Sequence, residues 1–282
     1  MEMEKNRAED IVDLINSSGA IILEGAISAL AALSSEDSRV LKIVAKEGAD
    51  DRKLKKILSA AKSKNIETIV FAPGEMAAFE KAANSSGAFS LGNTHGGIFA
   101  VAKKREFLTP QELLCALPKD QKYVSIAIIE GIEDPYNLGY AARAVYTQGT
   151  NALILPRRDF GVSEATIEKA STGTFSRMPV AVFSNDKNSK TELADMLKAE
   201  GFVIYCIEKN AKASSVFEVE FAEKAVFVIG GEKRGISGDF LQNADEIVKI
   251  PYANPFSHSL AAQSAATIVS YEIHRQRAGR RW

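Results

Sequence analysis

The sequence has few of the residues that build disulfide-linked or metal-linked folds. It contains two cysteines, Cys115 and Cys206, and three widely spaced histidines, His95, His258 and His274. Two cysteines cannot make a disulfide framework, and the chain has no CxxC pair that would begin a zinc site. We therefore expect no bound metal and a reducing, cytoplasmic environment.

Long apolar runs and an excess of one charge are also lacking. No apolar run approaches the ~18 residues of a membrane span, and the polar first residues, MEMEKNRAEDIVDL, do not resemble a signal peptide. The 35 Lys and Arg residues nearly balance the 36 Asp and Glu residues, which gives a net charge of −1. We expect no membrane partner, and any surface for nucleic acid must be a local basic patch.

The remaining composition is that of an ordinary globular protein, with 46% hydrophobic and 25% charged residues, and 282 residues are enough for about two domains. Residues 1–107 alternate short apolar runs with amphipathic helical patterns, which predicts a small α/β domain. Residues 108–121 contain two prolines and are typical of a linker. Residues 122–282 form the second predicted domain.

Short, almost wholly apolar runs divide the second domain. They are residues 126–132, 151–156, 178–183, 201–207, 225–231 and 246–251. Such runs are typical of strands that are covered on both faces, and helical patterns separate them, which predicts an open parallel sheet between two layers of helices. Ligands of such sheets bind beyond the carboxyl ends of the strands, so we expect the site in the loops after residues 131, 156, 231 and 251.

The first unusual segment is EGIEDPYNLGYAARAV, residues 130–145. An apolar strand runs into the turn Asp134-Pro135, and Asn137 stands where a helix would begin and could cap it. Arg143 follows in the second turn. An ordinary capped helix with a surface arginine explains this pattern. A site in which Asn137 holds the geometry and Arg143 meets an anionic or hydroxyl-bearing substrate explains it equally well.

The second segment is VFVIGGEKRGISGDF, residues 226–240. Gly230, Gly231 and Gly235 would let a ligand approach the backbone closely. The spacing is not G-x-G-x-x-G, and no GK[ST] follows, so neither a dinucleotide site nor a P-loop is indicated. A nucleoside-like ligand that is uncharged or zwitterionic fits better. Glu232 at the tip is either a polar anchor or a solvated loop residue.

The third segment, residues 250–277, is a loop with Pro251 and Pro255 that leads into a helix, expected from Ser257 or Ser259, which opens with small residues. A well-packed terminal helix is a sufficient explanation for those small residues. His258 lies beside serines, but the chain has no G-x-S-x-G motif and no acid partner can be placed. A Ser-His hydrolase is therefore disfavoured.

In this order, the three segments resemble the motifs of the SpoU/TrmH family of RNA ribose 2′-O-methyltransferases, in the SPOUT superfamily. The motif D-P-x-N-x-G-x-x-x-R is matched by Asp134, Pro135, Asn137, Gly139 and Arg143. The motif G-x-E-x-x-G-[LI]-S is matched by Gly230, Glu232, Gly235, Ile236 and Ser237. The third motif, S-L-N-x-S before a small-residue helix that ends in Y-E, is matched by Ser259, Leu260, Tyr271 and Glu272.

The resemblance implies a parallel-sheet α/β-knot catalytic domain with a trefoil knot, preceded by an RNA substrate-binding domain in residues 1–107. It implies a homodimer that transfers a methyl group from S-adenosylmethionine to a ribose 2′-hydroxyl of rRNA or tRNA. The implied cofactor-binding residues are Gly230, Gly231, Gly235, Ile250 and Leu260.

The same resemblance implies Arg143, Asn137, Glu232 and Ser259 as catalytic residues. A free guanidinium has a pKa above about 12, so we favour Arg143 as an organiser of the hydroxyl and the adjacent phosphate over a role as base. Asn137 and Glu232 would hold the loops and Arg143 in place, and Ser259 would contact substrate or cofactor. Lys233 and Arg234 are the expected RNA-binding residues, because they lie inside the glycine-rich loop.

One departure from the family pattern leaves an alternative open. Ala261 stands where the third motif has Asn, and Gln263 where it has the second Ser. Ala261 favours a catalytically impaired RNA-binding paralogue of the same fold, whereas Asn137, Arg143 and Glu232 favour an active enzyme. A nicotinamide oxidoreductase with a similar sheet is disfavoured because G-x-G-x-x-G is missing.

Overall fold

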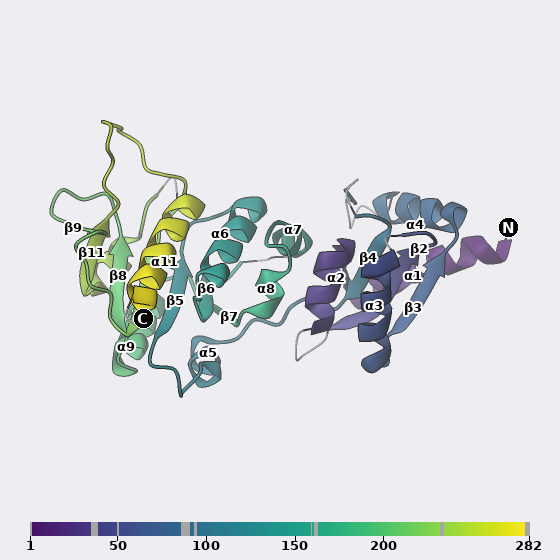
Figure 1. The fold of residues 1–282 in the computed structure, drawn as a ribbon, viewed down its shortest axis with the longest axis horizontal. Helices are drawn as coiled ribbons and strands as arrows, with labels where there is room; N and C mark the ends of the chain where they lie inside the picture. Colours follow the sequence, from purple (N-terminus) through teal and green to yellow (C-terminus); the bar gives the residue numbers. More distant parts are fainter. Residues whose placement is uncertain are drawn as a thin grey trace. The chain divides into compact units, whose positions relative to one another are not determined.

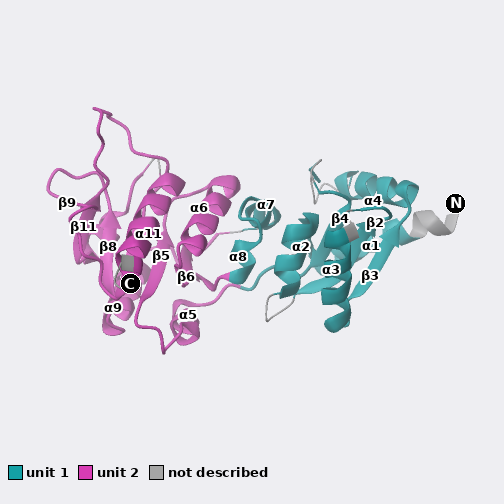
Figure 2. Ribbon diagram, viewed as in Figure 1, with its two compact units in different colours: residues 1–106, 160–177 teal, residues 107–159, 178–282 magenta. Residues whose placement is uncertain are grey.

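A computed structural model describes residues 2–34, 39–49, 51–85, 91–92, 95–158, 160, 163–231 and 234–279. The chain forms two compact units, which Figure 2 shows in different colours. Unit 1 comprises residues 1–106 and 160–177, and unit 2 comprises residues 107–159 and 178–282. Residues 160–177 lie within the range expected for the second domain but group with unit 1, and the expected linker 108–121 groups with unit 2.

Unit 1 contains a four-stranded mixed sheet in the order β1-β4-β2-β3. Its strands are β1 (Ile21–Glu24), β2 (Val40–Lys46), β3 (Glu67–Phe71) and β4 (Ile98–Ala102). Strand β2 pairs parallel with β3 and antiparallel with β4, and β1 pairs antiparallel with β4.

Helices cover both faces of this sheet (Figure 1). They are α1 (Glu2–Ser18), α2 (Gly25–Ser34), α3 (Asp51–Ser63) and α4 (Pro73–Ser85). Ile43 of β2 packs in a cluster with residues of α2 and α3, whereas the next residue, Val44, packs in a cluster with residues of α1 and α4. This alternation follows from the strand geometry, because successive side chains point to opposite faces.

A segment from later in the chain completes unit 1. It contains α7 (Ser163–Ala170) and α8 (Thr174–Arg177). Arg39 forms ion pairs with Glu164 and Glu168 of α7, whose side chains are 2% and 1% exposed. At the turn between the helices, Gly173 has a φ of +78°, and a Cβ there would lie less than 3.0 Å from Ala31 of α2. Charge pairing and close packing thus both hold the segment in unit 1.

Unit 2 contains a seven-stranded parallel sheet in the order β7-β6-β5-β10-β8-β11-β9. Its strands are β5 (Val124–Ile129), β6 (Ala152–Pro156), β7 (Val180–Phe183), β8 (Val203–Ile207), β9 (Ser214–Ser215), β10 (Lys224–Ile229) and β11 (Glu246–Lys249). The predicted α/β fold with a parallel sheet is therefore confirmed. Each predicted apolar run overlaps one strand, and the two-residue strand β9 had not been predicted.

The helices of unit 2 are α5 (Pro110–Ala116), α6 (Pro135–Thr147), α9 (Lys187–Ala199), α10 (Gly238–Asn243) and α11 (Ala262–Gly279). Helix α5 lies in the expected linker, where Thr109 and Glu112 form a capping box and Leu113 joins the core. Helix α11 packs against α6 (Figure 1). It begins at residue 262, later than the expected 257 or 259, because the loop with Pro251 and Pro255 continues to Ala261.

Within the part of the chain that the structure describes, no helix is both long and apolar enough to cross a membrane. The same residues contain no cluster of three or more His, Cys, Asp or Glu side chains that could hold a metal ion.

Candidate functional site

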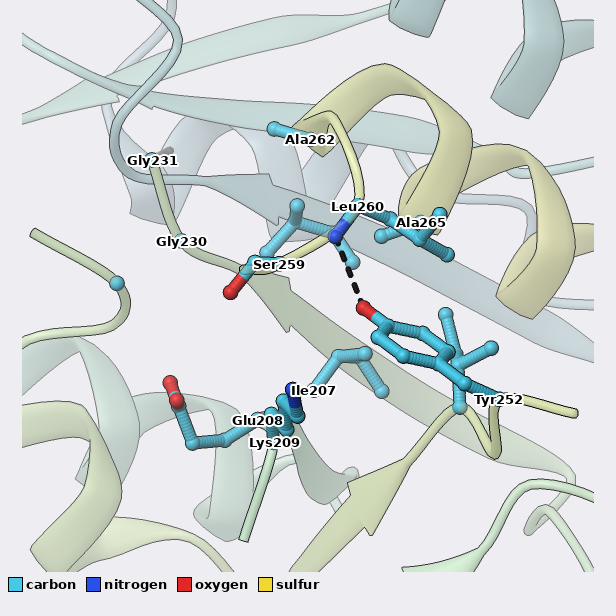
Figure 3. A pocket seen from close by; sticks show the side chains of 13 residues that line it. Ile207, Glu208, Lys209, Gly230, Gly231, Tyr252, Ser259, Leu260, Ala262 and Ala265 are labelled. Carbon is cyan, nitrogen blue, oxygen red and sulfur yellow. Dashed lines mark hydrogen bonds between the residues drawn. The ribbon is translucent and has the colours of Figure 1, made fainter. Parts of the chain in front are cut away.

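A pocket lies at the carboxyl edge of the parallel sheet in unit 2, between the loops that follow β8, β10 and β11 (Figure 3). These three strands are neighbours in the sheet, so their loops leave the same edge side by side. The pocket is lined by all of the predicted cofactor residues, which are Gly230, Gly231, Gly235, Ile250 and Leu260. Ser259, predicted to contact substrate or cofactor, also lines it. Two distant motifs therefore meet in one place.

At glycine positions beside this pocket, backbone segments approach one another unusually closely. A Cβ on Gly230 would lie less than 3.0 Å from backbone atoms of Gly235 and Ile236, and a Cβ on Gly131 would lie equally close to the backbone of Gly231. Gly231 and Gly235 exchange two backbone hydrogen bonds of 3.2 and 2.9 Å, and Gly235 has a φ of +64°. No side chain fits at Gly131, Gly230 or Gly231, because the ends of two strands and a reversing loop share the space.

The loop that follows β11 is fixed to the pocket by two side chains. The backbone N–H of Leu260 donates a 2.9 Å hydrogen bond to the hydroxyl oxygen of Tyr252 (Figure 3). The Nζ of Lys209 donates to the carbonyl oxygen of Phe256 and lies 5.1 Å from the centre of the Tyr252 ring. Residues 252–260 thus form a braced loop beside the pocket.

Three polar residues that line the pocket had not been predicted from the sequence, namely Tyr252 and the two residues after β8, Glu208 and Lys209. The loops expected to hold the site were those after residues 131, 156, 231 and 251, and the loop after 207 was left out. Its strand has the same apolar pattern as the others, so the signal was present in the sequence. The strand order determines which loops meet, because it places β8 between β10 and β11.

A buried ion pair supports the pocket from behind. One carboxylate oxygen of Glu130, at the end of β5, lies 2.7 Å from the Nζ of Lys190 on α9, and both side chains are less than 10% exposed. The other oxygen accepts a 2.8 Å hydrogen bond from the backbone N–H of Ser237.

Burial, together with the carboxylates of Glu130 and Glu208, raises the pKa of the Cys206 thiol to about 12, so this cysteine stays protonated at neutral pH.

Asn137 and Arg143 lie on α6, and among the described residues the pocket lining includes neither. The expectation that Asn137 caps this helix was wrong. Asp134 is the N-cap and accepts a 2.8 Å hydrogen bond from the backbone N–H of Asn137, because its carboxylate precedes the first helical residue, Pro135. The Arg143 side chain is exposed, and Tyr136 and Tyr140 beside it are each 50% exposed.

The glycine-rich loop is described only in part. Arg234 is exposed and lines an open cleft that adjoins the pocket, together with Lys209 and Ser259. Glu232 and Lys233 lie outside the described residues. At the start of α11, the buried Oε1 of Gln263 has no hydrogen-bond partner among the residues described.

Comparison with known proteins gives consistent matches. The model of the SpoU rRNA Methylase family matches residues 124–271. A protein of Staphylococcus epidermidis, assigned to the TrmH family of tRNA/rRNA methyltransferases, is 34% identical over 183 residues, which are 65% of this chain and 71% of that protein. A Staphylococcus aureus (strain COL) protein with the same assignment is 29% identical over 236 residues, which are 84% of this chain and 88% of that protein.

Two solved structures share the fold. The SpoU methyltransferase AviRb from Streptomyces viridochromogenes, in complex with AdoMet, is similar with a TM-score of 0.70 and 20% identity, over 94% of this chain and 92% of that chain. An RNA 2′-O ribose methyltransferase is similar with a TM-score of 0.72 and 20% identity, over 96% of both chains.

Proposed function

The chain belongs to the SpoU rRNA methylase family of RNA methyltransferases, and from that premise we propose that it transfers the methyl group of S-adenosylmethionine to a ribose 2′-hydroxyl of rRNA or tRNA. The observation that carries this proposal is the pocket at the carboxyl edge of the sheet, which gathers Gly230, Gly235 and Leu260 from two separate motifs. The comparisons give no support to the alternative of an impaired paralogue.

The chemistry of the pocket suits S-adenosylmethionine. Ile207, Ile250 and Leu260 offer apolar surface to a purine, and the backbone groups of the glycine-rich loop can form hydrogen bonds with it. The carboxylate of Glu208 adds a negative charge that complements a cationic ligand. When bound, the cofactor supplies a methyl group on a positively charged sulfur, which a hydroxyl oxygen can attack. The AviRb structure, which contains AdoMet, supports this assignment.

We propose that Arg143 organises the RNA at the reacting centre. Its guanidinium carries a permanent positive charge and five donors, which suit it to hold a ribose hydroxyl and the neighbouring phosphate rather than to remove a proton. Asn137, in the first turn of the same helix, and Glu232 would keep Arg143 and the loops in place. Ser259, at the edge of the pocket, would contact the substrate or the cofactor.

Because Arg143 does not line the pocket of its own chain, we propose that a homodimer completes the site. Tyr136 and Tyr140 lie beside Arg143 on α6, and Tyr271 on the neighbouring helix α11 is 55% exposed. Aromatic side chains are enriched at protein interfaces, so this face is the expected contact between two copies. The trefoil knot implied by the family stays a prediction.

The RNA would be bound close to the glycine-rich loop. Arg234 lies at the cleft beside the pocket and can meet a phosphate there, and Lys233 precedes it in the chain. Unit 1, which contains residues 1–106, would select the RNA. Both substrates would be available in the cytoplasm, where we expect the reaction to occur.

The test is methyl transfer from labelled S-adenosylmethionine to total cellular RNA, followed by alkaline hydrolysis. A methyl group on a 2′-hydroxyl protects the adjacent linkage, so the label is expected in alkali-resistant dinucleotides. The test variant is Arg143→Ala. Its rate of methyl transfer should be about 10²- to 10³-fold lower than that of the wild type. Its affinity for the cofactor should be unchanged, because Arg143 does not line the pocket. Label on a base, or no transfer by a protein that binds the cofactor, would overturn the proposal.

A further inference from the structure

The loop between β11 and α11 presents an apolar aromatic ring to solvent beside the pocket. Phe256 is 54% exposed. Its ring centre lies 5.6 Å from that of His258, with the two planes at 65°, and 6.3 Å from that of Tyr252. Three aromatic rings therefore follow one another along this loop, and Phe256 and His258 face the solvent.

The backbone that carries the Phe256 ring is held in position by its surroundings. The carbonyl oxygen of Phe256 accepts a hydrogen bond from Lys209, and the hydroxyl of Tyr252 fixes the far end of the loop at Leu260. Lys209 also lies over the Tyr252 ring at 5.1 Å. A braced loop loses little backbone conformational entropy when it binds a ligand.

The position of the loop points to the kind of ligand. Ser259 lines both the pocket and the adjoining cleft, three residues after Phe256. Among the described residues that line the same cleft, the exposed cations Lys209 and Arg234 outnumber the one carboxylate, Glu208. Exposed rings next to cations are the elements with which proteins hold unpaired nucleotides, since the ring stacks on the base and the cations meet the phosphates.

We propose that the ring of Phe256, against which His258 packs edge to face, forms a stacking platform for an unpaired nucleobase of the RNA substrate, next to the nucleotide whose ribose is methylated. This inference rests on the proposed function. The platform binds bases of any kind through their flat faces, and it rejects a base that remains paired in a duplex, because both faces of that base are already stacked.

The test compares Phe256→Ala with Phe217→Ala, which removes a 73% exposed phenylalanine from the loop after β9 of the same unit. Affinity for a short, mixed-sequence, single-stranded oligoribonucleotide and for its duplex is measured by fluorescence anisotropy, and cofactor affinity by calorimetry. Phe256→Ala is expected to weaken single-strand binding by roughly fivefold to a hundredfold. Phe217→Ala should leave this binding unchanged, and Phe256→Trp should retain it.

Several outcomes would overturn the platform. They are single-strand affinity of Phe256→Ala equal to that of the wild type, an equal loss in Phe217→Ala, or an equal loss of duplex binding. Unchanged cofactor affinity in Phe256→Ala shows that the variant is folded. Failure of the wild type to methylate any RNA would instead overturn the proposed function, so the two failures can be told apart.

Discussion

Four glycines allow backbone segments to pack closely against one another beside the pocket. Gly131 lies in the loop that follows β5, and Gly230, Gly231 and Gly235 lie in the glycine-rich segment that follows β10. Each of Gly131, Gly230 and Gly231 has backbone atoms where a Cβ would lie. Backbone atoms cannot move aside as a flexible side chain can, so a substitution must displace the loop itself.

We expect Gly230→Ala to lower both stability and cofactor affinity. Its methyl group would lie less than 3.0 Å from the backbone of Gly235 and Ile236. Overpacking of this kind lowers the free energy of unfolding by about 1–3 kcal/mol. If the displaced loop binds the cofactor less well by the same amount of free energy, the affinity falls by about tenfold or more. Calorimetry with S-adenosylmethionine and thermal unfolding measure the two effects. The control is Gly238→Ala, where a Cβ meets nothing within 4 Å; equal behaviour of both variants would contradict the prediction.

Some residues of the site could be predicted from the sequence, and others could not. The glycines stand in a local motif whose spacing is visible along the chain. Lys209 contacts the Tyr252 ring and the carbonyl oxygen of Phe256, which stands 47 residues later in the chain. No local pattern encodes such a contact. The capping residue was misassigned because Asp134 and Asn137 are both suitable caps, and the backbone chooses between them.

At the scale of elements, α7 is held in unit 1 by a charge cluster. Arg39, which precedes β2, pairs with Glu164 and Glu168, and the backbone N–H of Arg105 donates a 3.1 Å hydrogen bond to Glu164. We expect Arg39→Met to destabilise unit 1 by up to about 3–5 kcal/mol, because it removes one of the two cations, Arg39 and Arg105, that face the buried carboxylates.

The matched control for Arg39→Met is Lys42→Met. Lys42 lies on β2 and pairs with Glu67, whose side chain is 60% exposed. Removal of an exposed pair costs less than about 1 kcal/mol. Chemical denaturation followed by circular dichroism measures both variants, and a similar small effect in the two would show that the buried cluster does not hold the segment.

Glu168 should also make stability depend on pH. Burial raises the pKa of its carboxyl group above the ordinary value, and its Oε2 has no hydrogen-bond partner among the described residues. The folded protein therefore holds this proton more tightly than the unfolded chain. The contribution of Glu168 to the free energy of unfolding is then largest below the ordinary pKa and falls as pH rises through the raised value.

Glu168→Gln removes this titration. Relative to the wild type, the free energy of unfolding of the variant should rise as the pH increases from the ordinary carboxyl pKa of 4.5 through the raised pKa of Glu168. Urea denaturation across that range measures the difference. Glu67→Gln, at an exposed position, serves as the control, and a difference for Glu168→Gln that stays flat with pH would contradict the assignment.

Most elements were predictable because their signals are local. Apolar runs located the main strands of the parallel sheet, whereas Ser214–Ser215 were missed because two polar residues carry no strand pattern. The membership of α7 in unit 1 depends on Arg39 meeting Glu164, which is 125 residues away in sequence. Such a pairing is a property of the folded chain and leaves no trace in hydrophobic periodicity.

For the whole molecule, the division into units differs from the division of the sequence. Residues 1–106 contain a complete four-stranded sheet, yet their core is finished by residues 160–177. Ala165 packs against the cluster that contains Ile21 and Leu23 of β1, and the turn at Gly173 packs on α2. Residues 1–106 alone would expose both surfaces and leave Arg39 without its carboxylates.

We therefore expect a fragment of residues 1–106 to be less stable than the same residues in the full chain. Hydrogen exchange should show lower protection in β1 and α2 of the fragment, since these elements contact the missing segment. A synthetic peptide of residues 160–177 should restore protection, and a peptide of scrambled sequence should not. Protection in the fragment equal to that in the full chain would contradict the expectation.

The return of residues 160–177 to unit 1 has a consequence for synthesis on the ribosome. A growing chain emerges from its amino terminus, so residues 1–106 leave the exit tunnel long before the two helices that complete their core. Until residue 177 has left the tunnel, the segment with which Arg39 pairs is incomplete, although β5 and β6 of the next unit have already left the tunnel. The amino-terminal unit therefore cannot finish folding before the first strands of its neighbour have emerged, which departs from the usual order in which domains fold one after another during translation.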